Sequence, residues 1–123
     1  MTLADFESVK QIPVEIYALE EVRLSIKRHD QQALAFREFV DSMIARRVVQ
    51  IIEAKQIIDF VSDQLSRDVL KAYLTNYRKT FDVIADEKNY CLKTIQRAYR
   101  CGIDELVENG FLTNAARRTR KPL

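Results

Sequence analysis

The stretch FREFVDSMIARRVVQIIEAKQIIDFV, residues 36–61, decides the fold that this sequence predicts. Its apolar residues come largely as doublets, such as Val48-Val49, and the doublets recur at spacings of three and four. A half-buried strand alternates apolar and polar residues, so this spacing indicates a helix although many of the residues are β-branched. Asp30 is a suitable N-cap, and neither glycine nor proline interrupts the residues that follow it. We therefore predict one long helix over residues 31–65.

A second long helix is predicted over residues 67–101. Its apolar positions alternate between spacings of four and three, which is the period of about 3.5 residues typical of a coiled coil. A polar cluster at 62–68 marks the turn before it, with Ser66 as the N-cap, and Gly102 suits the left-handed residue that closes a helix. Lys88 is the only polar residue on this stripe. The stripe consists of Leu70, Leu74, Tyr77, Phe81, Ile84, Lys88, Cys91, Ile95 and Ala98.

Shorter helices are predicted around the two long ones, over residues 2–10, 13–29 and 103–108. Short connections then produce an all-α fold of the helical-bundle type. The two long helices form an antiparallel, coiled-coil-like hairpin, and the shorter N-terminal helix 13–29 packs on its base. We expect a single helical domain over residues 1–113 and a basic tail over 114–123.

The end of the domain is predicted from a turn and an apolar anchor. Asn109-Gly110 should end the last helix, since these residue types favour turns. Phe111 and Leu112 should then fold back onto the domain because both are large and apolar.

The composition of the 123 residues argues against most enzyme classes. With 47% apolar and 31% charged residues, the chain is typical of a soluble globular domain. One histidine, His29, and two cysteines are too few for a four-ligand zinc site, and no glycine-rich phosphate loop is present. We therefore expect a non-enzymatic protein with no catalytic residue, no metal and no cofactor.

Cys91 and Cys101 are interpreted as reduced thiols that serve as small packing residues, because ten residues on one helix separate them too far for a disulfide. The sequence shows no apolar leader, no presequence pattern and no run of about 20 apolar residues. A cytoplasmic location without a membrane span is therefore expected.

The distal half of the predicted hairpin has only two helices to cover apolar residues on both of its sides. Each large side chain left exposed forgoes about 1.5–3 kcal/mol of burial, so we expect a second helical surface there. The function predicted first is a non-enzymatic adaptor or assembly subunit, either a homodimer or a helical component of a larger assembly. Closure of the chain into a monomeric four-helix bundle stays open. The expected interface comprises Val48, Ile51, Ile52, Ile58, Val61, Leu65, Leu70, Tyr73 and Tyr77.

An alternative function is a small nucleic-acid-associated regulator. The last ten residues carry four basic side chains and no acid, and further bases lie near the end of the predicted helix 67–101. Such residues would contact phosphates without reading sequence, or would dock into an acidic groove of a protein. A tail with no partner also stays open. The candidate contacts are Lys93, Arg97, Arg100, Arg117, Arg118, Arg120 and Lys121.

Residues 95–111 partly match a helix-turn-helix, because Ala98, Gly102 and Ile103 have the spacing of its turn. The helix after that turn would carry three acidic residues, which disfavours insertion into the major groove. The sequence therefore gives little support for the motif at this position.

Overall fold

The structure is a computed structural model that describes residues 1–113. Within these residues the secondary structure is helical, apart from one isolated bridge between Thr2 and Thr113. The prediction of an all-α fold is confirmed. The elements are α1 Leu3–Ser8, the 3₁₀ turn η1 Val9–Gln11, α2 Ile12–Ser25, α3 Gln31–Ile58, α4 Gln64–Leu74, α5 Phe81–Lys88 and α6 Leu92–Glu108.

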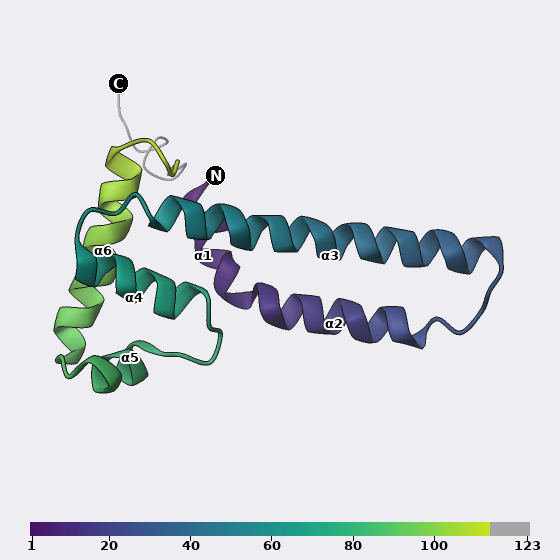
Figure 1. Cartoon of the computed structure of the whole chain (residues 1–123), viewed down its shortest axis with the longest axis horizontal. Coiled ribbons are helices and arrows are strands. Elements are labelled where there is room, and N and C mark those ends of the chain that lie inside the picture. Colours follow the sequence, from purple (N-terminus) through teal and green to yellow (C-terminus); the bar gives the residue numbers. More distant parts are fainter. Residues whose placement is uncertain (114–123) are drawn as a thin grey trace, which may run out of the picture.

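The elements form an elongated arm and a broader head (Figure 1). The antiparallel helices α2 and α3 form the arm, and α3 continues into the head at its C-terminal end. The head contains α1, α4, α5 and α6, with α6 packed mainly on α4 and α5.

Local sequence features explain where the arm begins and turns. The side chain of Asp30 accepts a hydrogen bond of 2.9 Å from the backbone N–H of Ala33, as expected for the N-cap of α3. Val40 and Ala54 of α3 are buried at helical spacing. Ion pairs join the two helices, with Arg23 Nε 2.6 Å from an Asp41 oxygen, so the two helices are held in register.

The long helix predicted over 67–101 is not formed. Its residues belong to α4, α5 and most of α6, and the helix predicted over 31–65 ends at Ile58. The breaks occur at caps, because Asp63 accepts from the backbone of Ser66 and starts α4. The hairpin expected between those two long helices is therefore absent from residues 1–113. The antiparallel pair is α2 with α3 instead.

Gly102 does not close a helix, because α6 continues through it to Glu108. A Cβ atom at this position would lie 2.7 Å from Cδ1 of Leu70 on α4. The glycine therefore permits the close crossing of α4 and α6. The predicted turn at Gly110 is confirmed, since its φ is 81°.

The predicted apolar anchor after α6 is also confirmed. Leu112 is buried, and the ring of Phe111 stacks on Phe60 with centroids 4.5 Å apart. Backbone hydrogen bonds from Leu3 N to Thr113 O (2.8 Å) and from Thr113 N to Met1 O (3.1 Å) join this segment to the start of the chain.

Two groups of buried residues hold the head together. The larger one joins the base of the arm to α1, α4 and α6, and includes Phe6, Ile58, Leu74 and Leu106. The smaller one lies between α4, α5 and α6. No helix within the described part of the chain is long and apolar enough to cross a membrane.

Candidate nucleic-acid interface

Helices α5 and α6 are joined by a tight turn of residues 89–91. Asn89 adopts the left-handed conformation with φ 58°, which asparagine tolerates better than most residues. The backbone N–H of Tyr90 donates back to the carbonyl of Ala85 over 3.0 Å, which is the long bond of a Schellman cap. This cap ends α5 sharply and lets α6 begin at Leu92.

A small apolar core fixes the angle between these helices. Ala85 of α5 packs with Ile95 and Ala98 of α6, and Val69 of α4 completes the group. Two helices joined by a three-residue turn and packed on a preceding helix have the chain order of a helix-turn-helix. The second helix of such a unit enters the major groove of DNA.

The outer face of α6 carries positive charge. Lys93, Arg97 and Arg100, which were predicted as phosphate contacts, are all exposed and recur at spacings of four and three. Gln96 is exposed beside them. Among the described residues, none of the ion pairs involves these three cations. The structure therefore brings three residues of the predicted basic set together on one face, whereas Arg117, Arg118, Arg120 and Lys121 lie outside the described residues.

The start of α6 lacks a capping side chain. Cys91 is the N-cap residue and makes no side-chain hydrogen bond to the backbone of the first turn. The N–H groups at a helix N-terminus bind anions well when no side chain satisfies them. The free N-terminal N–H groups thus adjoin Lys93 on the same end of α6.

The expectation that both cysteines are packing residues is wrong, because Cys91 and Cys101 are free and exposed. The Sγ atom of Cys91 lies 3.0 Å from the hydroxyl oxygen of Thr94. The hydrogen bond with the side chain of Thr94 holds the pKa of the Cys91 thiol below its ordinary value.

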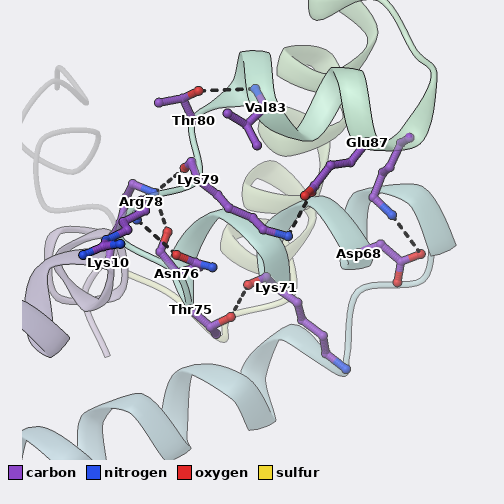
Figure 2. Close-up of polar contacts among 11 residues, drawn as sticks. Lys10, Asp68, Lys71, Thr75, Asn76, Arg78, Lys79, Thr80, Val83 and Glu87 are labelled. Atoms are coloured by element: carbon purple, nitrogen blue, oxygen red, sulfur yellow. Dashed lines mark hydrogen bonds and ion pairs between the residues drawn. The ribbon is translucent and has the colours of Figure 1, made fainter.

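Lys10 fixes the loop that leads into α5 (Figure 2). Its ammonium donates to the carbonyl oxygens of Tyr73 (2.8 Å), Asn76 (3.0 Å) and Lys79 (2.6 Å). Burial lowers the pKa of Lys10, and the three carbonyl dipoles oppose that shift because they stabilise the charged form. The N-terminal segment is therefore tied directly to the loop that precedes α5.

Aromatic packing supports the same region from inside. Tyr73, Phe81 and Tyr99 come from α4, α5 and α6, and the rings of Tyr73 and Phe81 stack with centroids 4.2 Å apart. The hydroxyl of Tyr99 donates to Glu7 over 2.8 Å. Burial, followed by this contact with Glu7, raises the pKa of Tyr99. A shallow groove of about 400 Å³ lies beside the ring, next to Gln96.

The exposed surface of α5 carries no positive charge, except near the C-terminal end of the helix. Asp82 and Asp86 are exposed on it, and Glu87 pairs with Lys79 at 2.9 Å. Phosphate binding by this unit would therefore depend on α6 rather than on α5.

The helix-turn-helix that the sequence disfavours at residues 95–111 is not formed there, because Ala98, Gly102 and Ile103 all lie inside α6. The tight turn in the structure is at residues 89–91, earlier in the chain than the turn considered at Gly102 and Ile103. Asn89, a residue that tolerates left-handed backbone, was the sequence feature that could have located it.

The nine residues expected to contact a partner are divided between core and surface. Ile58, Val61 and Leu70 are fully buried and pack within the head. Those that are partly buried are Ile51, Leu65 and Tyr73, and those that are exposed are Val48, Ile52 and Tyr77.

No known protein family, curated protein or solved structure matches the chain. Within residues 1–113, no group of three or more His, Cys, Asp or Glu side chains is placed to hold a metal ion. Function is therefore inferred from the geometry of α5, α6 and the arm.

Proposed function

We propose that this protein binds duplex DNA by placing α6 in the major groove. The observation that carries the proposal is the tight turn at Asn89, after which α6 presents Lys93, Arg97 and Arg100 on one exposed face. An α-helix fits the width of the major groove, and positive residues on it neutralise the phosphates at the groove edges.

The side chains on this face differ in what they can recognise. Arg97 lies in the N-terminal half of α6, and an arginine there pairs with the edge of a guanine through two hydrogen bonds. Gln96 is suited to an adenine edge. Lys93 and Arg100 lie on either side of this pair along the helix and are placed for phosphates. Three cationic contacts give a salt dependence with a slope of about −3 in log K against log salt.

The proposal is tested by fluorescence anisotropy with labelled duplex DNA at low and moderate salt. The triple variant Lys93→Ala/Arg97→Ala/Arg100→Ala should lose at least about tenfold in affinity and most of the salt dependence. Arg46→Ala is the matched control, because Arg46 is an exposed arginine on the arm and should leave binding unchanged. Equal binding by the triple variant and the wild type would contradict the proposal.

A second proposed function is a non-enzymatic, cytoplasmic interaction protein that uses its helical arm, as a homodimer or as a component of a larger assembly. Large apolar side chains on the arm favour it, since Tyr17, Leu24 and Phe39 are each more than half exposed. Exposed apolar residues that gather into a contiguous patch mark protein–protein interaction sites. Light scattering on a sizing column at two protein concentrations tests it, and a strictly monomeric chain would count against self-association.

A further inference from the structure

The groove beside Tyr99 lies where α1, α5 and α6 meet, and we call it the Tyr99 groove. Its volume of about 400 Å³ is within the range of about 300–1,000 Å³ that small-molecule sites occupy. Its apolar wall consists of Phe81 at the start of α5 and of Tyr99 and Ile103, which are one turn apart on α6. The ring centroids of Phe81 and Tyr99 are 5.2 Å apart, and Tyr73 of α4 packs against both rings. The aromatic wall is therefore preformed.

Two opposite charges line the same groove. Glu7 comes from α1 and Arg100 from α6, and both residues are exposed. Oε2 of Glu7 accepts the hydrogen bond of 2.8 Å from Tyr99, which is a neutral donor. Among the ion pairs within residues 1–113, none involves Glu7 or Arg100. The Tyr99 groove therefore presents a negative and a positive charge that are not paired with each other.

The positive edge of the groove continues along α6. Gln96 also lines the groove and lies four residues before Arg100, so the two side chains share one side of the helix. The amide of Gln96 and the guanidinium of Arg100 both donate N–H groups, as a carboxylate requires. The carboxylate of Glu7 accepts hydrogen bonds only, so it is suited to an ammonium group.

These features specify the chemistry of a ligand. An aromatic ring packs face-on or edge-on against the rings of Phe81 and Tyr99. A carboxylate on Arg100 and an ammonium on Glu7 would each form charge-assisted hydrogen bonds. A free amino acid with an aromatic side chain carries all three groups. An aromatic acid without the ammonium would bring a second negative charge near Glu7, and an amine without the carboxylate would bring a second positive charge near Arg100.

We propose that the Tyr99 groove binds a free aromatic amino acid as the zwitterion, with the ring on Phe81 and Tyr99, the carboxylate on Arg100 and the ammonium on Glu7. This inference is independent of both proposed functions. Arg100 is also a proposed phosphate contact, so the binding of the amino acid is measured in the absence of DNA.

L-tryptophan is a suitable probe because the chain contains no tryptophan, so indole fluorescence comes from the ligand alone. Its fluorescence anisotropy should rise to saturation as the protein is added. Two matched analogues each lack one charge, since indole-3-propionate has no ammonium and tryptamine has no carboxylate. Each analogue should bind about fivefold more weakly than L-tryptophan. L-phenylalanine, measured by titration calorimetry, should bind at the same site and compete with L-tryptophan.

Two variants assign the charges to their residues. Arg100→Gln should weaken the binding of L-tryptophan about fivefold but should not weaken that of tryptamine, which lacks the group that Arg100 binds. Glu7→Gln should weaken L-tryptophan to a similar extent but not indole-3-propionate, and the glutamine retains an oxygen that accepts from Tyr99. Arg46→Gln is the matched control, because Arg46 is exposed on the arm, away from the groove.

Three results would overturn the proposal. The first is the absence of binding by both L-tryptophan and L-phenylalanine. The second is equal binding of L-tryptophan and its two analogues, which would show that the charges do not recognise the ligand. The third is selective binding that neither Arg100→Gln nor Glu7→Gln weakens, which would place the site elsewhere. None of these results bears on DNA binding by α6, because no DNA is present.

Discussion

Lys10 contacts Tyr73 in two ways, through a hydrogen bond of 2.8 Å to its carbonyl oxygen and through its ring, whose centroid lies 3.8 Å from Nζ. The ammonium also holds the carbonyls of Asn76 and Lys79. A cation over an aromatic face is stabilised by the ring quadrupole, and charged hydrogen bonds are stronger than neutral ones. One side chain from the N-terminal segment therefore organises the loop before α5.

Replacing Lys10 with Met should destabilise the protein by about 1.5–3 kcal/mol, since three carbonyl oxygens lose a charged donor. Urea unfolding monitored by circular dichroism measures the free energy of unfolding. Lys93→Met is the matched control and should change it by less than about 0.5 kcal/mol, because Lys93 is exposed. Equal losses of unfolding free energy in the two variants would show that the contacts of Lys10 do not stabilise the protein.

Gly102→Val should destabilise the protein by about 1–3 kcal/mol, because the added side chain overpacks the crossing of α4 and α6. Leu70 is fully buried, so its side chain has little room to move away. The neighbouring substitution Cys101→Val places the same side chain at an exposed position and should have little effect. Thermal unfolding of both variants measures how much stability each substitution removes. A Gly102→Val variant as stable as the wild type would show that α4 and α6 move apart easily.

Acid should weaken the caps of α3 and α4. The backbone N–H of Ala33, followed by the side chain of Arg28, holds the pKa of Asp30 below its ordinary value, and the backbone N–H of Ser66 does the same for Asp63. The unfolded state therefore binds more protons, so the stability from both carboxylates is complete above about pH 4 and is lost as the pH falls through the lowered pKa values.

The double variant Asp30→Asn/Asp63→Asn should lose less stability between pH 5 and pH 2 than the wild type. Asparagine caps a helix about as well as aspartate but does not titrate. Urea unfolding at a series of pH values provides the comparison. Parallel curves for the two proteins would show that the caps do not carry the acid sensitivity.

Thr94→Val should slow the alkylation of Cys91 by iodoacetamide near neutral pH. The substitution removes the side-chain hydrogen bond that lowers the pKa of the thiol, so less thiolate is present. Mass spectrometry of peptides separates this reaction from that of Cys101, which serves as an internal control because it makes no hydrogen bond with Thr94 within residues 1–113. An unchanged rate at Cys91 would assign its reactivity to other groups.

The sequence predicted the starts of α1 and α3 and the turn after α6, where a local cap or turn defines them, but it placed the cap of α4 at Ser66 instead of Asp63. Thr2 accepts from the backbone of Asp5 at the start of α1, and Asp30 and Gly110 act as expected. The continuous helix over 67–101 failed for a physical reason. Leu70, Ile84 and Ile95 are all buried, so their spacing does report one apolar side. Three separate helices that pack around one core retain the same order of buried residues, and spacing alone does not reveal the breaks.

The candidate site was predicted only in part. The pattern of charges in the sequence was sufficient to predict Lys93, Arg97 and Arg100 as phosphate contacts. Basic residues at helical spacing can be identified without knowledge of the tertiary structure. The turn that makes α6 a separate helix depends on Asn89 entering the left-handed region, which its sequence neighbours do not require. Contacts such as that of Lys10 with Asn76 join residues 66 positions apart and could not be read from any local pattern.

The bridge between Thr2 and Thr113 has a consequence for the order in which the chain folds during synthesis. The arm is built from residues close in sequence, such as Arg23 and Asp41, so it can form while the ribosome is still adding α4. Helix α1 completes its docking only after the segment at Thr113 has emerged, because the backbone N–H of Leu3 donates to the carbonyl of Thr113. Nascent chains on one messenger would therefore display their arms before their heads are complete.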